Sequence, residues 1–142
     1  MTFMLHFHID GDPVPKGRPK FSKVGGFMRA YTPKKTQDYE AIVQQAARAA
    51  MGPTDLLETP LGVFLYIRLP IPQSHNKKRR EACLSGVEKP IKKPDIDNLA
   101  KSVLDGMNGI VWRDDSQIVS LHVTKVYASG TGVDVLVKEE LE

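Results

Sequence analysis

The segment Lys93–Ile118 constrains the fold of this chain more than any other, because it places acidic residues on both sides of one short helix. Asp95 and Asp97 stand before or at the start of that helix, and Asp114 and Asp115 follow it. If these carboxylates act together, the chain has to reverse its direction directly after the helix. The fold therefore has to return a later segment to the level at which the helix begins.

A helix over about residues 98–108 is predicted from one apolar stripe at helical spacing. We expect Asp97 or Asn98 to supply its N-cap, and Asn108-Gly109 is typical of a left-handed helix end. The residues of the stripe are Leu99, Val103, Leu104 and Met107.

The spacing allows the two acidic pairs to meet. About eleven helical residues carry the chain about 16 Å, and residues 110–115 span up to about 20 Å when extended, with Gly109 permitting the reversal. Lys101 lies four residues after Asp97, within reach of the carboxylates, and Asp105 continues the same face. Converging carboxylates repel each other, and a hard cation relieves the repulsion, which favours Mg²⁺, with Mn²⁺ as an alternative.

A purely structural interpretation of the same residues stays open. In that interpretation Asp97 only caps the helix, and Lys101 and Asp105 form an exposed ion pair one turn apart. Asp114 and Asp115 would then belong to an ordinary turn. Acid pairs two residues apart occur elsewhere in the chain, so spacing by itself does not select a site.

Basic residues are clustered although the net charge is only +3. Such clusters are typical of proteins with a polyanionic partner, and the alternative is a solvated surface. The first cluster lies within residues 16–35, and the second within residues 77–93. The candidate contacts to a nucleic-acid backbone are Lys16, Arg18, Lys20, Lys77, Lys78, Arg79, Arg80 and Lys93.

The fold is predicted to be α+β in one domain spanning residues 1–142, because 41% hydrophobic and 26% charged residues are globular values. We expect a mixed or antiparallel sheet of about four strands packed with two or three helices. Strands are predicted at 3–9, 61–69, 117–126 and 132–137, the last two as an antiparallel hairpin, with a short strand at 27–31 and helices at 37–51 and 76–84.

Two details concern the first third of the chain. Thr36 is the expected N-cap of the helix at 37–51, whose core face is predicted to include Ile42. The segment 11–26 is rich in Gly, Pro and basic residues and is predicted to be an extended loop. Phe21 or Phe27 is a candidate for stacking on bases, although aromatic residues of small domains more often belong to the core.

Several classes of protein are disfavoured. No apolar run approaches the roughly 20 residues of a membrane helix, and no secretion signal is recognisable, so a cytoplasmic protein without membrane contact is expected. The single Cys83 excludes an internal disulfide and is taken to exclude a cysteine-based zinc site. His6 and His8 are interpreted as outward polar positions of a strand. The lack of a Gly-rich phosphate loop argues against a nucleotide cofactor and a small-molecule phosphatase.

The chain resembles the RusA family of Holliday junction resolvases. The motifs that carry the resemblance are Pro94-Asp95-Ile96-Asp97-Asn98-Leu99-Ala100-Lys101, Asp105-Gly106-Met107-Asn108 and Trp112-Arg113-Asp114-Asp115-Ser116-Gln117-Ile118, with PVPKGRPKF and YTPKK nearer the N-terminus.

The resemblance implies a Mg²⁺-dependent endonuclease that acts as a homodimer on four-way DNA junctions in recombination and repair, often carried by prophages, in the cytoplasm of a bacterium or phage-infected host. It implies that Asp95, Asp97 and Asp115 are catalytic metal ligands and that Lys101 is the essential lysine. Asn98 and Asp114 are implied to support them. Two alternatives stay open: a metal-dependent nuclease of broader branched-DNA specificity, and a non-catalytic nucleic-acid-binding module.

Overall fold

The computed structural model of the chain describes residues 3–141, which form six strands, three α-helices and one 3₁₀-helix. In chain order they are β1 (Met4–Asp10), β2 (Lys20–Val24), β3 (Phe27–Tyr31), α1 (Lys34–Met51), β4 (Leu61–Pro70), α2 (Lys77–Leu84), α3 (Ile96–Met107), η1 (Asp115–Gln117), β5 (Ile118–Ala128) and β6 (Gly132–Glu139).

Four of the strands form one mixed sheet in the order β1-β6-β4-β5. β6 runs antiparallel to both β1 and β4, whereas β4 and β5 are parallel. The predicted α+β class with a mixed sheet of about four strands is confirmed. The predicted hairpin of the last two strands is wrong, because β4 lies between them. β4 is buried along most of its length, and the central position gives it a hydrogen-bonding partner on each side.

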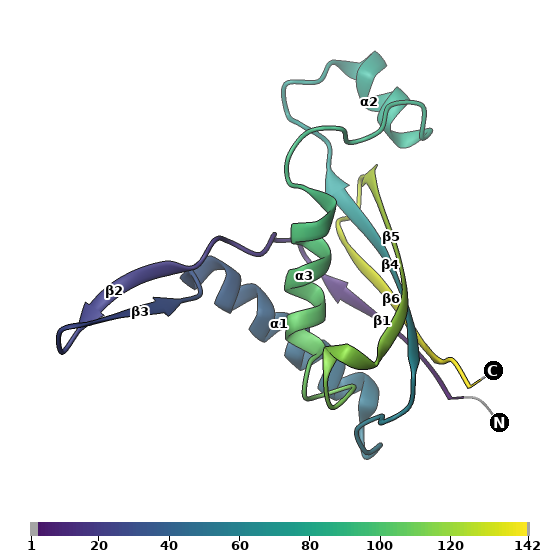
Figure 1. The fold of residues 1–142 in the computed structure, drawn as a ribbon. Helices are drawn as coiled ribbons and strands as arrows, with labels where there is room; N and C mark the ends of the chain where they lie inside the picture. Colours follow the sequence, from purple (N-terminus) through teal and green to yellow (C-terminus); the bar gives the residue numbers. More distant parts are fainter. Residues whose placement is uncertain (1–2, 142) are drawn as a thin grey trace.

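Helices α1 and α3 pack against one face of this sheet, as Figure 1 shows. In β1 the alternation predicted from the sequence is confirmed, since Leu5, Phe7 and Ile9 are buried and the residues between them are exposed. His6 and His8 are among the exposed ones, as expected. Trp112, which follows α3, is fully buried and belongs to the same core.

The first helix starts earlier than predicted. Pro33 occupies the N-cap position of α1 and Thr36 lies inside the helix, where it is buried. The Thr36 hydroxyl accepts a hydrogen bond from the Gly17 backbone amide at 3.0 Å, so it holds the preceding segment rather than the helix end. Ile42 is exposed, contrary to expectation, because the face toward the core follows Tyr39, Val43 and every fourth residue after them.

Helices α1 and α3 approach each other closely at Gly106. A Cβ atom at that position would lie 2.6 Å from the Cβ atom of Val43 and 3.2 Å from the carbonyl oxygen of Glu40. No ordinary side chain fits at such distances. Gly106 therefore sets how closely the helix with the acidic motif packs on α1.

Strands β2 and β3 form a separate two-stranded hairpin that projects away from the rest of the molecule (Figure 1). The strand predicted at 27–31 is confirmed, but the prediction of a loop over all of 11–26 is wrong at Lys20–Val24. Gly25 and Gly26 connect the strands with φ of 58° and 86°. Two consecutive positive φ angles match the two-residue turn that suits the twist of a hairpin.

The basic helix α2 begins where predicted, and the side chain of its N-cap residue Asn76 accepts a hydrogen bond from the Arg79 amide at 2.9 Å. Across residues 3–141, none of the helices combines the length and apolar character needed to cross a bilayer.

Candidate functional site

The acidic motif begins directly before α3. Asp95 occupies the N-cap position with extended backbone angles and makes no side-chain capping bond. Asp97 lies in the first turn, where one of its carboxylate oxygens accepts a hydrogen bond from the Asn98 amide at 3.0 Å. The prediction of Asp97 or Asn98 as the N-cap is therefore wrong by two or three residues. The correction leaves the Asp95 carboxylate uncommitted to the helix end.

The chain reverses after α3 as predicted. Gly109 has a φ of 80°, which an L side chain rarely adopts, and its amide donates to the Trp112 carbonyl at 2.8 Å. The amides of Ile110 and Val111 both donate to the Met107 carbonyl at 3.0 Å. This tight turn brings the second acidic pair back toward the helix.

Asp115 is held by the core. The indole N–H of the fully buried Trp112 donates to the Asp115 carboxylate at 2.7 Å. Partial burial and the nearby negative charges of Asp105 and Asp114 raise the pKa of Asp115, while the Trp112 hydrogen bond and the positive charge of Lys101 act in the opposite direction. Asp115 therefore belongs to the same electrostatic neighbourhood as Asp105 and Lys101.

Asp114 positions the short helix that carries Asp115. Its side chain accepts a hydrogen bond from the Ser116 amide at 3.2 Å and another from the Ser116 hydroxyl. The Gln117 side chain accepts a hydrogen bond from the Asp114 amide at 2.9 Å, which completes a capping box. The Ser116 hydrogen bonds lower the pKa of the Asp114 carboxyl. Asp114 is thus used for local structure.

Gln117 ties this turn to the rest of the domain. Its amide group donates to the carbonyl oxygens of Leu57 and Thr59 at 2.9 and 3.1 Å. The Leu57 amide in turn donates to the Val111 carbonyl at 2.9 Å. The segment before β4 therefore fixes the position of Asp115 along the axis of α3.

A chain of ion pairs crosses the two helices. Lys101 pairs with Asp105 at 3.6 Å, Asp105 with Lys16 at 3.0 Å, and Lys16 with Glu40 at 2.7 Å. Partial burial lowers the pKa of Lys16, but its bonds to Glu40 and Asp105 outweigh this and raise it overall. The ion-pair partner of Lys101 in this structure is Asp105 rather than Asp97.

The Lys101–Asp105 pair of the structural interpretation is confirmed, whereas Glu40 and the local role of Lys16 were missed by sequence reasoning. The periodicity of α3 placed Asp105 on the face of Lys101, which was the available signal. No comparable signal connected Lys16 with Glu40 on α1, since 24 residues separate them and the contact depends on how the preceding segment lies on the helices.

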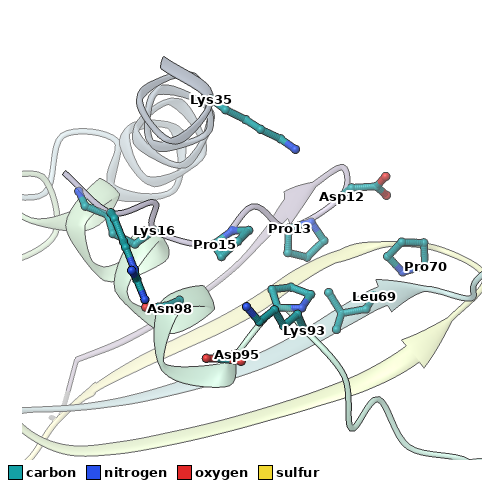
Figure 2. A pocket seen from close by; sticks show the side chains of 12 residues that line it. Asp12, Pro13, Pro15, Lys16, Lys35, Leu69, Pro70, Lys93, Asp95 and Asn98 are labelled. Atoms are coloured by element: carbon teal, nitrogen blue, oxygen red, sulfur yellow. The ribbon is translucent and has the colours of Figure 1, made fainter. Parts of the chain in front are cut away.

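A cleft of about 590 Å³ lies beside the start of α3. Asp95 and Asn98 reach it from α3, and Figure 2 shows Lys35 extending over it from α1. Basic side chains therefore surround a carboxylate at the entrance to the acidic motif. The residues that line the cleft are Asp12, Pro13, Pro15, Lys16, Arg18, Lys35, Leu69, Pro70, Lys93, Pro94, Asp95 and Asn98.

Three candidate DNA contacts, Lys16, Arg18 and Lys93, line this cleft, and Lys20 lies on β2. The remaining four are on α2, and none of them is among the residues that line the cleft. One of these, Arg79, is already paired with Glu88 through two hydrogen bonds of 3.2 and 2.9 Å.

The three carboxylates predicted as metal ligands are not gathered to ligand-to-ligand distance. Among residues 3–141, no group formed from Asp95, Asp97 and Asp115 places its oxygens within 4.8 Å of one another. The reversal brings Asp115 beside α3, and the final convergence stays a prediction.

A different group of side chains does meet that distance. Ligand atoms of His75, Cys83 and Glu88 lie within 4.8 Å of one another, with the Cys83 sulfur 3.7 Å from Nδ1 of His75. The expectation that a single cysteine excludes such a grouping was too broad, because the fold adds two ligands from other segments. The Glu88 carboxylate is nevertheless neutralised by Arg79, which a metal ion would have to displace.

Comparison with known proteins places the chain in a family. A family model described as endodeoxyribonuclease RusA matches residues 10–138. The chain belongs to the RusA endodeoxyribonuclease family. The uncharacterised protein YqaN of Bacillus subtilis strain 168 is 32% identical over 137 residues, which cover 95% of this chain and 96% of YqaN. The RusA match includes both the cleft and the complete acidic motif, so the predicted resemblance is confirmed and a nuclease activity is indicated.

Proposed function

We propose that this protein is a divalent-metal-dependent endodeoxyribonuclease that resolves four-way DNA junctions by paired phosphodiester hydrolysis. The observation that carries the proposal is the RusA match across the segment in which Asp115 returns to the side of α3. The basic cleft at the start of α3 supports a polyanionic substrate.

The donor atoms of the proposed ligands have the chemistry that a hard cation requires. Asp95, Asp97 and Asp115 offer only carboxylate oxygens, the ligands that Mg²⁺ and Mn²⁺ prefer. Burial and the negative charges of Asp105 and Asp114 raise the pKa of Asp115, and a nearby dication would favour its charged form. When bound by these three residues, Mg²⁺ would supply Lewis-acid activation of water and neutralise charge on the phosphate.

The other residues of the site have roles that do not depend on an ion. Lys101 is exposed at 61% of its side chain and free to turn from Asp105 toward a phosphate whose charge develops during cleavage. Trp112 holds the orientation of Asp115, and Asp114 holds the turn that presents it. Asn98 borders the cleft next to Asp97 and is positioned to contact the DNA backbone.

A homodimer is part of the proposal. A four-way junction is symmetric and its resolution needs two incisions, whereas each chain offers one acidic motif. Two-fold symmetry supplies two such sites at a fixed separation. The second candidate is a nuclease of broader specificity that also cuts forks and flaps. The exposed basic side chains of α2 favour it, because they can contact the backbone of any DNA.

The test is nicking of a synthetic four-way junction and of a linear duplex of the same sequence, with Mg²⁺ or with a chelator. We expect symmetric nicks in the junction only with Mg²⁺, and a loss of well over a hundredfold for Asp97→Asn and Asp115→Asn with DNA binding retained. Asp38→Asn, which changes an exposed acid of α1, is the matched control and should cut normally.

Equal cutting of junction and duplex would favour the broader nuclease. Cutting that persists in chelator, or in both site variants, would contradict the proposed site. Tight binding without any nicks would instead identify a DNA-binding module.

A further inference from the structure

The β2–β3 hairpin stands outside the packed body with all ten strand residues exposed. Phe27 is 78% exposed, Met28 68% and Phe21 64%. A two-stranded hairpin is marginally stable in water when nothing covers it, and clustered exposed apolar side chains mark interaction surfaces. The hairpin therefore has the features of a segment that is completed by a partner.

The charge of the hairpin indicates the chemistry of that partner. No Asp or Glu occurs between Pro13 and Gln37. The strands carry three basic residues, Lys20, Lys23 and Arg29. None of them takes part in an ion pair within the described part of the chain. A polyanion complements this surface, whereas a second copy of the chain, with a net charge of +3, does so less well.

Both faces of the hairpin combine basic side chains with apolar or aromatic ones. Cross-strand partners share a face. One face therefore carries Lys20 opposite Tyr31, Ser22 opposite Arg29 and, nearest the turn, Val24 opposite Phe27. The other carries Phe21 opposite Ala30 and Lys23 opposite Met28. Basic side chains beside flat aromatic rings suit a nucleic-acid strand, because the basic groups can pair with its phosphates and the rings can stack on its nucleobases.

The root of the hairpin is fastened to the candidate site. The Lys16 amide donates to the Asn98 carbonyl of α3 at 2.8 Å. The Gly17 amide bonds Thr36 of α1, and on the returning side the Gln37 amide group donates to the Thr32 carbonyl at 2.6 Å. The hairpin thus leaves the body from the edge of the cleft at the start of α3, with both of its ends fixed.

The dimensions are suitable for DNA. Five strand residues span about 17 Å at roughly 3.4 Å per residue. The major groove of B-DNA is about 12 Å wide and admits a two-stranded ribbon. DNA whose backbone enters the cleft continues within reach of the hairpin.

We infer that the β2–β3 hairpin is a DNA-binding arm, in which Lys23 and Arg29 contact phosphates and Phe27 at the turn stacks on a base that a branch point leaves exposed. This inference rests on the proposed function for its substrate, a branched DNA. It adds the element by which branched DNA is distinguished from a plain duplex. Lys20, near the root, extends the phosphate track back to the cleft.

The first test measures binding in chelator, so that no variant cuts the DNA. The salt dependence of affinity for a fluorescent four-way junction is compared for wild type, Lys23→Ala/Arg29→Ala and the control Arg48→Ala/Lys138→Ala. Arg48 and Lys138 lie at the ends of α1 and β6, so the control removes the same charge away from the arm. The loss of two phosphate contacts is expected to reduce the magnitude of the slope of log affinity against log salt by about 1.8, and the control should leave this slope unchanged.

The second test concerns stacking. Phe27→Ala and Phe27→Leu are compared on the junction and on a linear duplex, with 2-aminopurine placed at the branch point. We expect both variants to lose about 5- to 150-fold in junction affinity and the change in 2-aminopurine fluorescence, with duplex affinity altered less than twofold. Val87→Ala, which shortens another exposed apolar side chain, is the control and should bind as wild type.

These results are separable from those on cleavage. Wild-type nicking together with an unchanged salt slope and unchanged junction affinity in the arm variants would overturn the arm and leave the nuclease proposal intact. If the wild type does not nick the junction but junction binding depends on the arm, the nuclease proposal is overturned and the DNA-binding arm stands. If sedimentation shows that the arm variants lose self-association while their DNA slopes stay at the wild-type value, the partner is a second copy and the inference is wrong.

Discussion

The segment from α3 to η1 and the β2–β3 arm both carry residues suited to DNA, but the fold treats them in opposite ways. In the first, the turn that carries Asp115 is held by side-chain hydrogen bonds: Trp112 bonds Asp115, and Gln117 bonds the segment before β4. In the second, the strand side chains are exposed beyond a fixed root. Chemistry requires atoms held within a fraction of an ångström, whereas contact with a DNA backbone tolerates adjustment.

The strongest test of this contrast replaces one large side chain in each region. Trp112→Ala opens a cavity in the core and is expected to reduce the free energy of unfolding by about 3–5 kcal/mol. Phe27→Ala, in the arm, is expected to change it by less than about 0.5 kcal/mol. Urea unfolding followed by circular dichroism measures both. If both variants lost the same free energy of unfolding, Phe27 would have to be packed in solution, and the two regions would not differ in the way that the structure indicates.

Asp114 tests how far positioning alone matters. Asp114→Ala removes the acceptor of the capping box, and we expect single-turnover cleavage to fall about 10- to 100-fold because Asp115 loses its fixed orientation. Asp114→Asn keeps an acceptor oxygen and should restore most of the rate. If Asp114→Asn is as slow as Asp114→Ala, the negative charge itself is required, and Asp114 is more than a positioning residue.

The contact between α1 and α3 offers a smaller change. Gly106→Ala inserts a Cβ atom against Val43 and is expected to lower the free energy of unfolding by about 1–3 kcal/mol. Gly130→Ala is the control, since its nearest neighbour would be a side-chain nitrogen of Arg68 at 3.7 Å. Thermal melts that leave both variants at the wild-type midpoint would mean that the two helices separate easily.

The smallest effect is expected at Tyr39. Its hydroxyl is buried and has no hydrogen-bond partner among the described residues, and burial raises its pKa. Tyr39→Phe removes the unsatisfied group and should stabilise the body by about 1 kcal/mol without altering DNA binding. Chemical denaturation measures the change, and a clear loss of stability would show that the hydroxyl has a partner in solution.

Local features of this fold could be predicted from the sequence. The alternation of β1, the stripe of α3 and the reversal at Gly109 depend on neighbours along the chain. The position of β6 between β1 and β4 could not be predicted, because strand pairing is decided by how the buried strand β4 satisfies both of its edges. Thr36 was wrongly predicted to be the N-cap of α1. Its actual bond to Gly17 depends on how a distant segment lies on the helix, which local sequence does not indicate.

The site shows the same division. The acidic motif was visible because its members are close in sequence. The pairing of Asp105 with Lys16 was not, since 89 residues separate them and only the packed helices bring them together. The first strand of the arm, Lys20–Val24, was predicted to be a loop because exposed strands lack the apolar alternation by which strands are recognised.

The place of β6 in the sheet has a consequence for the making of this protein. Among the strands formed by residues 3–141, β6 is the last to be synthesised, and it is the only one paired with β1. A chain interrupted before Gly132 carries every acidic residue of the motif yet lacks the scaffold that orients them. Removal of β6 is therefore expected to leave β1 and β4 without their shared partner, so that the sheet on which α3 packs cannot assemble.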